Sequence, residues 1–172
     1  MIIRPHHGVS PVIPASAFVA ETAVVIGDVV LGEQASLWFN TVVRGDVHSI
    51  RIGDRTNIQD GSVVHVTKDR FPTLLGNDVV VGHMVMLHGC TVEDRCLIGM
   101  ASLLLDDCHI GTESIVAAGS LVPPGFRAPP RSLLMGRPAR VVRPVSDEEV
   151  ERLILTGVRN YVEYQRGYRQ VD

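Results

Sequence analysis

Three of the seven histidines in this 172-residue chain lie within one short stretch, at His65, His83 and His88. Neutral imidazole nitrogens are ligands of zinc, iron and cobalt ions in many proteins. Side chains that can orient such ligands, or a substrate, lie nearby in the sequence: Arg44, Asp46, Asn57, Gln59 and Asp60. These residues can form a metal centre only if the fold brings separate parts of the chain together.

A repeat of six residues predicts strands that could bring these separate parts of the chain together. A small or compact residue stands four positions after nearly every aliphatic one, and Gly often follows the aliphatic residue directly. A short fixed period of this kind predicts a parallel β-helix, a solenoid whose coils bury their apolar sides only by stacking. The aliphatic positions are Ile13, Val19, Val25, Leu31, Leu37 and Val43, then Ile52, Ile58, Val64, Leu75, Val81 and Leu87, then Ile98, Leu104, Ile110, Val116 and Val122.

Three hexapeptides make one triangular coil, with the large side chains inside and the coils about 4.8 Å apart. We name the faces of this prism a, b and c in chain order, with Ile13 on face a. The repeat predicts nearly six coils over residues 12–126. Extra residues interrupt it at 49–51, 70–74 and 93–97, each after a face c hexapeptide and before a face a one. These insertions are expected to project from one corner of the prism.

The remaining residues predict two further segments of the same domain, since a chain of 172 residues favours one domain. Residues 127–145 are rich in proline and are expected to cross from the prism to a helix. Ser146 and Glu149 have the spacing of a capping box, which starts a helix. Apolar residues then recur at helical spacing, so we expect one α-helix over residues 146–169, packed lengthwise on the prism.

The polar residues can now be placed on the faces. Arg44, His65 and His88 directly follow successive face c aliphatic residues, so they should form an outward column with one side chain per coil. The coil spacing allows His65 and His88 to approach one metal ion. Asp60 and His83 share a column on face b, which does not reach that ion within one subunit. A third ligand is then most easily supplied by another subunit, and three such contacts close into a homotrimer.

A plainer interpretation remains open for these histidines. An outward histidine on a β-helix is most often a solvated surface residue, and two in a column can form a simple polar ladder. Arg44 and Asp46 can likewise be a plain salt bridge at an interface.

The combination of residues resembles the motif of the γ-class carbonic anhydrases and their close homologues. The matching stretches are residues 43–46, 57–61, 64–65, 82–83 and 87–90, and the resemblance covers most of the chain. It implies a left-handed helix, a hand that the spacing alone does not give. Hexapeptides by themselves are unspecific, because many acyltransferases contain them.

The resemblance implies a role for each site residue. His65 and His88 of one subunit and His83 of its neighbour would bind Zn²⁺, with Fe²⁺ or Co²⁺ as alternatives. A metal-bound hydroxide would attack CO₂ to give bicarbonate. Gln59 would orient the hydroxide or the substrate, and Asp60 would hold an imidazole N–H. Arg44 and Asp46 would set the subunit interface, while Asn57 and Tyr161 are further candidates whose alternative is a packing or turn role.

The sequence departs from the best-known members in lacking their extended acidic loops. Asp69 is the only acid in the stretch 66–70 that follows His65. Rapid CO₂ hydration needs a route for the proton as well as an activated water. Other functions therefore stay open: a metal-dependent acyl-CoA thioesterase that uses the same site, a metal-free hexapeptide acyltransferase, or a silent scaffold.

Composition limits the partners and the compartment. The net charge of −3 gives no basic surface for nucleic acid or an anionic membrane. The N-terminus lacks an apolar signal segment, and no run of about eighteen apolar residues occurs. Three cysteines cannot all pair, so a reducing compartment is the simpler interpretation. We expect a soluble, cytoplasmic protein with a small-molecule substrate and no nucleic-acid or membrane partner.

Overall fold

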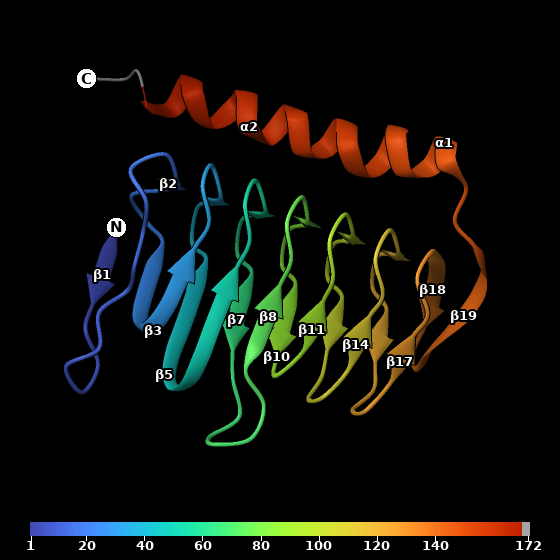
Figure 1. The fold of residues 1–172 in the computed structure, drawn as a ribbon, viewed down its shortest axis with the longest axis horizontal. Coiled ribbons are helices and arrows are strands. Elements are labelled where there is room, and N and C mark those ends of the chain that lie inside the picture. The colour runs from blue at the N-terminus through green and yellow to red at the C-terminus, as the bar shows by residue number, and fades with distance from the viewer. Residues whose placement is uncertain (170–172) are drawn as a thin grey trace.

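The computed structural model describes residues 1–169 as an elongated prism of short strands with a helical segment along its length (Figure 1). The fold is a left-handed parallel β-helix, which confirms the predicted fold class. Each coil pairs with the coils before and after it. Leu87, for example, is in register with Val64 of the preceding coil and Leu104 of the following one.

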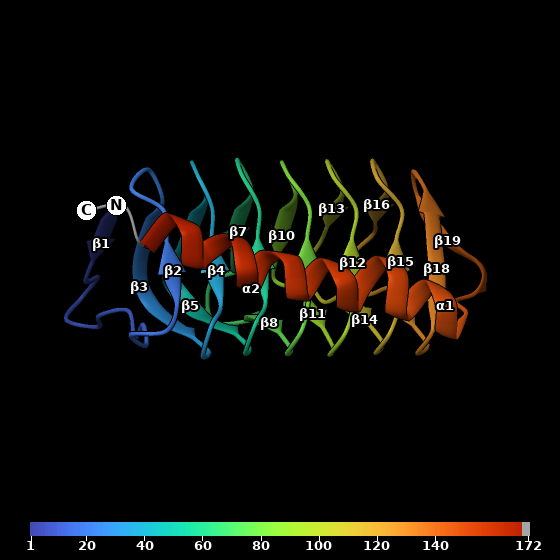
Figure 2. The same ribbon diagram turned by 90° about the horizontal axis from the view of Figure 1, so that it is seen from above.

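Face b is one sheet, in which the strands of successive coils stack in parallel and a last strand closes the end in the antiparallel direction. The helical segment lies over this sheet (Figure 2). In spatial order the strands are β2 (Phe18–Val19), β4 (Ser36–Leu37), β6 (Asn57–Ile58), β9 (Val80–Val81), β12 (Leu97–Ile98), β15 (Ile115–Val116), β18 (Ser132–Gly136) and β19 (Ala139–Pro144).

Faces c and a belong to a second sheet, because two long strands bend round the corner between them. These strands are β3 (Val24–Leu31) and β5 (Val42–Ile52), and β1 (Ile2–Arg4) pairs with β3. Face c continues with β7 (Val63–His65), β10 (Met86–His88), β13 (Leu103–Leu104) and β16 (Leu121–Val122). Face a continues with β8 (Thr73–Leu75), β11 (Thr91–Val92), β14 (His109–Ile110) and β17 (Arg127–Ala128).

The aliphatic residue of each hexapeptide fills the interior of the prism. Burying one such side chain contributes about 1.5–3 kcal/mol relative to leaving it exposed. Small hydroxyl residues are also buried at the corners, and they find partners: Ser62 donates to the Gly82 carbonyl across 3.0 Å. On face c the fully buried column contains Val25, Val43, Val64, Leu87, Leu104 and Val122.

The glycines that follow the aliphatic residues stand where successive coils touch most closely. A side-chain carbon added to Gly53 would lie 2.5 Å from the carbonyl group of Gly76 in the next coil. Because backbone cannot move aside at such a contact, only glycine fits at this position. The same reason applies to Gly32, where an added carbon would lie 2.5 Å from the backbone nitrogen of Asp54.

The structure corrects the predicted phase of the repeat near residue 92. Val92 lies inside face a, in register with Leu75 and Ile110, while Ile98 belongs to face b. Residues 93–97 are therefore not an insertion. The step from Leu87 to Val92 is one residue short, since the chain turns sharply at Gly89 with a φ of 58°. The prediction missed this face a strand and the continuation of the prism beyond residue 126, so the prism has about 7 turns instead of nearly six.

The other two breaks in the repeat lie at the corner between faces c and a. After β7 the chain leaves the prism as a loop, seen below it in Figure 1, which an isolated bridge between Thr67 and Phe71 closes. In β5 the extra residues form a bulge that shifts the register with β3 between Gly27 and Val29. The loop and the bulge flank the face c histidines.

Residues 127–145 do not form the crossing segment that their prolines suggested. β17 pairs in parallel with β14, and β18 with β15, so the prism continues through this stretch. β19 then runs back antiparallel to β18 and leads into the helix. The strands tolerate proline because Pro129, Pro130 and Pro138 fall outside the strands and Pro144 ends β19.

The helical segment begins where the capping box predicted it. The Glu149 backbone N–H donates to Ser146 Oγ across 3.2 Å, and the Ser146 backbone N–H donates to the Glu149 carboxylate across 3.1 Å. The segment comprises α1 (Asp147–Glu149), a π-helical part η1 (Val150–Leu155) and α2 (Thr156–Arg169). Val150 and Ile154 are buried against Ile115 of face b. None of the described helices has the length and apolar character needed to cross a membrane.

Candidate metal centre

His65 and His88 end the neighbouring face c strands β7 and β10 and stand in register with each other. Each follows a fully buried residue, Val64 or Leu87, so alternation along the strand turns the histidine ring outward. His65 Nδ1 lies 3.2 Å from His88 Nε2. The stacking of coils thus brings two imidazole nitrogens face to face.

A carboxylate holds the far nitrogen of each ring. His65 Nε2 lies 3.0 Å from Asp46 Oδ1, and His88 Nδ1 lies 2.6 Å from Asp106 Oδ1. Burial alone would raise the pKa of Asp46, but hydrogen bonds from His65 and Arg44 outweigh burial and lower that pKa. The pKa of Asp106 is lowered by a similar balance, in which the hydrogen bond from His88 opposes burial. Both carboxylates are therefore ionised at neutral pH and accept the ring N–H groups.

With Asp46 and Asp106 on the far sides of the rings, His65 Nδ1 and His88 Nε2 are the nitrogens left to bind a ligand. These two nitrogens face each other across 3.2 Å, so one ion could contact both. A tetrahedral zinc ion with Zn–N bonds of about 2.0–2.1 Å holds its nitrogens about 3.3–3.4 Å apart. The donor set and its spacing fit a shared divalent ion.

The pair is not a complete centre by itself. Within residues 1–169, no group of three or more histidine, cysteine, aspartate or glutamate side chains is arranged to hold a metal ion. Asp46 and Asp106 bind the far sides of the rings, so they are not further ligands. A structural zinc site needs four ligands and a catalytic one needs three from protein, so a zinc centre at this pair would need at least one further donor.

His83 lies elsewhere, directly after β9 and the following glycine on face b. Its Nδ1 lies 2.9 Å from Asp60 Oδ2, which leaves Nε2 as the nitrogen available to a ligand. His88 has the same arrangement, with its Nδ1 bound to a carboxylate. Each of the three imidazoles thus has one nitrogen bound to a carboxylate, through Nε2 in His65 and through Nδ1 in His83 and His88, but only His65 and His88 lie together within one subunit.

Gln59 and Asn57 form a buried amide pair at the end of β6. Gln59 Nε2 donates to Asn57 Oδ1 across 3.0 Å, and Asn57 is fully buried. Asn57 Nδ2 in turn lies 3.5 Å from the Val79 carbonyl of the next coil. Asn57 thus fixes the orientation of the Gln59 amide, and its own place is set by the stacking of coils.

Tyr161 belongs to α2, and the structure does not bring it to the histidine pair. Its ring packs against Trp38 with a centroid distance of 5.1 Å and an interplanar angle of 83°. Burial, and next the negative charge of Asp60, raise the pKa of Tyr161 to about 12. Tyr161 is therefore a neutral hydroxyl near Asp60 rather than a proton acceptor at neutral pH.

Sequence reasoning missed two residues of this site, Asp106 and Thr67. Asp106 follows the face c residue Leu104 by two positions, whereas His88 follows Leu87 by one, so Asp106 lies next to the histidine column but not in it. Thr67 Oγ1 donates to Asp106 Oδ2 across 2.8 Å from the loop after β7. Its contact depends on how that loop folds back, which no spacing in the sequence predicts.

Known proteins resemble this chain over almost its whole length, although no protein-family model matches it. A carbonic anhydrase of Geobacillus kaustophilus is 45% identical over 171 residues, which cover 99% of this chain and 93% of that protein. Mitochondrial gamma carbonic anhydrase 2 of Arabidopsis thaliana is 44% identical over 158 residues, or 89% of this chain. The chain spans just over half of that plant protein, 56% of its length.

A solved structure agrees with the fold. The crystal structure of a Bacillus cereus protein described as an acetyltransferase has a TM-score of 0.90 at 42% identity, and the match covers 96% of this chain and 97% of that one. Fold alone does not separate the hexapeptide enzymes from one another. The sequence similarity to the Geobacillus kaustophilus protein extends over nearly all of both chains, and we conclude from it that the chain belongs to the γ-class carbonic anhydrase family.

Proposed function

We propose that this protein is a metal-dependent enzyme that hydrates CO₂ to bicarbonate at the subunit interfaces of a homotrimer. His65 and His88 of one subunit and His83 of a neighbour would hold the ion, Zn²⁺ in first place with Fe²⁺ or Co²⁺ as alternatives. The observation that carries the proposal is the pair of imidazole nitrogens, 3.2 Å apart, with a carboxylate behind each ring. The family of the chain supports the same reaction.

The outer surface of face c supports an interface there. The side chains that directly precede its buried residues are aliphatic or thioether groups in successive coils, all partly exposed, whereas the equivalent positions of face a mix Val30 and Leu74 with Arg51, Thr91, His109 and Arg127. Face b is covered by the helical segment. An apolar sheet face with a metal half-site at its edge fits burial against another subunit, and repeated heterologous contacts close into a ring. The outward face c residues are Val42, Val63, Met86, Leu103 and Leu121.

The residues of this chain would bind and orient the reactants. A divalent ion held there would supply a coordinated water that ionises near pH ~7 and so would provide a nucleophile at neutral pH. Gln59, held by Asn57, offers an oriented amide for hydrogen bonding to substrate or product. Asp46 and Asp60 keep the protons of His65 and His83 on the far sides of the rings, and Arg44 holds Asp46 in place by an ion pair.

Elemental analysis of the purified protein together with stopped-flow CO₂ hydration tests the proposal. We expect about one divalent ion per chain, activity that is lost on chelation, and recovery when the ion is returned. His109→Ala is the matched control, because His109 pairs with Glu93 on face a and lies outside the site. The proposal is wrong if the protein binds no divalent ion, or if the metal-loaded protein hydrates CO₂ no faster than buffer.

Acyl transfer is the second candidate, favoured by the Bacillus cereus structure described as an acetyltransferase. Assays with a panel of acyl-CoA esters distinguish a metal-dependent thioesterase from a metal-free acyltransferase. Hydrolysis that requires the metal would indicate a thioesterase that uses the histidine site. Transfer to an acceptor that persists after chelation would indicate a metal-free hexapeptide acyltransferase.

A further inference from the structure

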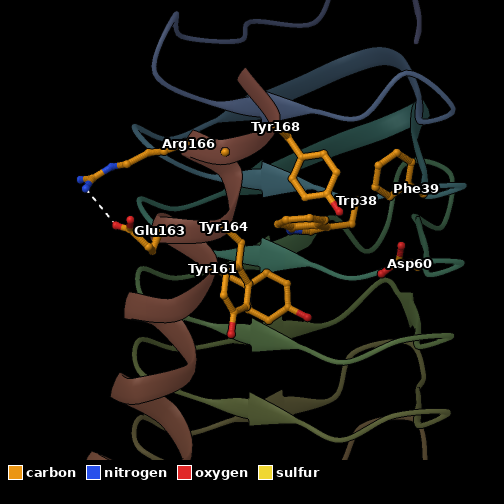
Figure 3. Close-up of a pocket in the computed structure, with 9 residues that line it drawn as sticks. Trp38, Phe39, Asp60, Tyr161, Glu163, Tyr164, Arg166 and Tyr168 are labelled. Carbon is orange, nitrogen blue, oxygen red and sulfur yellow. Dashed lines mark hydrogen bonds and ion pairs between the residues drawn. The ribbon is translucent and has the colours of Figure 1, made fainter. Parts of the chain in front are cut away.

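A pocket that shares Asp60 with the His83 side of the proposed site opens where α2 passes over the first coils of face b (Figure 3). Its volume is about 770 Å³, within the range of about 300–1,000 Å³ that is typical of small-molecule sites. That is far more space than CO₂ needs. Five aromatic rings and one carboxylate dominate its lining: Trp38, Phe39, Tyr161, Tyr164, Tyr168 and Asp60.

The rings stand at steep angles to one another, so they form walls instead of a stack. Trp38 meets Tyr161 at 83° and Tyr168 at 88°, with centroids 5.1 and 5.3 Å apart. Phe39 meets Tyr168 at 63° and 5.6 Å. A cluster that served only as core would be buried, but Tyr164 and Tyr168 are each 52% exposed. Aromatic surface is therefore presented to the open pocket.

The charge of the lining is negative. Figure 3 shows Asp60 facing the same space as the rings. Glu163 and Arg166 form an ion pair of 3.2 Å at the rim and balance each other. The Asp60 charge acts on the rings, since it is one cause, after burial, of the raised pKa of Tyr161. Ring faces and a carboxylate both attract a cation.

We propose that this aromatic pocket binds a small organic cation, a quaternary ammonium group, with the ring faces around it and Asp60 as its counter-ion. A metal ion would need more oxygen ligands than the lining offers. A primary ammonium would lose hydrogen bonds to water, because Asp60 already accepts one from His83. A quaternary ammonium has no N–H to satisfy and suits aromatic walls.

This inference goes beyond the proposed CO₂ chemistry and does not require a bound metal. Trp38 is the only tryptophan of the chain, so its fluorescence reports on the pocket directly. Choline and its uncharged analogue 3,3-dimethyl-1-butanol have the same shape and differ in charge. We expect saturable fluorescence changes with choline, at constant ionic strength, and an affinity about tenfold higher than for the analogue. Equal affinities, or no saturation with choline, would overturn the proposal.

Variants of Tyr164 sharpen the test, since this exposed residue lies outside the proposed metal site. Tyr164→Leu should weaken choline binding about fivefold, whereas Tyr164→Phe, which keeps the ring, should stay within about twofold. Circular dichroism confirms that both variants fold. Equal effects of the two substitutions would contradict cation recognition by the ring. CO₂ hydration measured on the same samples reports separately on the proposed function, so either idea can fail alone.

Discussion

The histidine pair and the aromatic pocket differ in what positions their side chains. His65 and His88 end strands inside the stack of coils, next to fully buried residues, and carboxylates hold both rings. The aromatic pocket takes three of its rings from α2, and the helical segment that contains α2 is attached to face b by side chains that include Ile154 of η1. The comparison teaches that the first site depends on the repeat itself, while the second depends on docking of the helix and can change without disturbing the prism.

Removing a ligand should have the largest effect. His88→Ala and His83→Ala should each lose nearly all bound metal and CO₂ hydration, while the aliphatic core keeps the chain folded. Elemental analysis and circular dichroism on the same samples check both parts. Retention of metal in either variant would contradict the ligand assignment.

Mixing these two variants tests whether the ligands come from different chains. In random heterotrimers each interface has about one chance in four of combining an intact His83 with an intact His88 partner, so about a quarter of the metal and activity should return. Exchange of subunits after mild denaturation produces such mixtures. Absence of any recovery, with exchange shown by differently tagged chains, would argue against shared sites.

Weakening the carboxylate behind a ring should have a smaller effect. Asp106→Asn removes the charge that holds His88 Nδ1, and we expect metal affinity to fall about 10–100-fold. Asp107→Asn is the matched control, because Asp107 pairs with the exposed Arg127 instead. Competition with a chelator measures both affinities. Equal affinities for the two variants would show that Asp106 does not support the site.

The helix cap offers a change that should affect only the pocket region. Ser146→Ala removes the side chain that accepts the Glu149 N–H, at a cost of about 1 kcal/mol. We expect the helical signal in circular dichroism to be lost at a lower temperature and the fluorescence of Trp38 to change, while the metal content stays the same. A parallel loss of metal would show that the two regions are not separable.

Acid should weaken the same cap. Arg143 first, and then the Ser146 backbone N–H, lower the pKa of Glu149 from 4.5 to about 2. A carboxyl group with a lowered folded-state pKa stabilises the fold above its ordinary pKa, and this contribution is lost as pH falls from 4.5 towards 2. The unfolding temperature of the parent should therefore exceed that of Glu149→Gln at about pH 6, and the difference should shrink towards pH 2. A difference that does not depend on pH would contradict this assignment.

Local patterns made much of the prism predictable. The six-residue spacing gave the inward columns, and Ser146 with Glu149 marked the start of the helix. The shortened corner at Gly89 was not predictable. The same sequence fits a five-residue step to Val92 or an insertion before Ile98, and only the register between coils shows which of the two is present.

The histidine pair was predictable for the same reason as the prism, since its members occupy equivalent positions in successive coils. The aromatic pocket was not. Its tyrosines meet Trp38 only because the helix runs back along face b to the first coils, and nothing local sets that direction.

Anomalous diffraction from crystals of the metal-loaded protein tests the central claim most directly. We predict a single peak at each subunit seam, about 2.0–2.1 Å from His65 Nδ1, His88 Nε2 and Nε2 of a neighbour's His83. Rings that point apart in the crystal, with only solvent between them, would contradict the account.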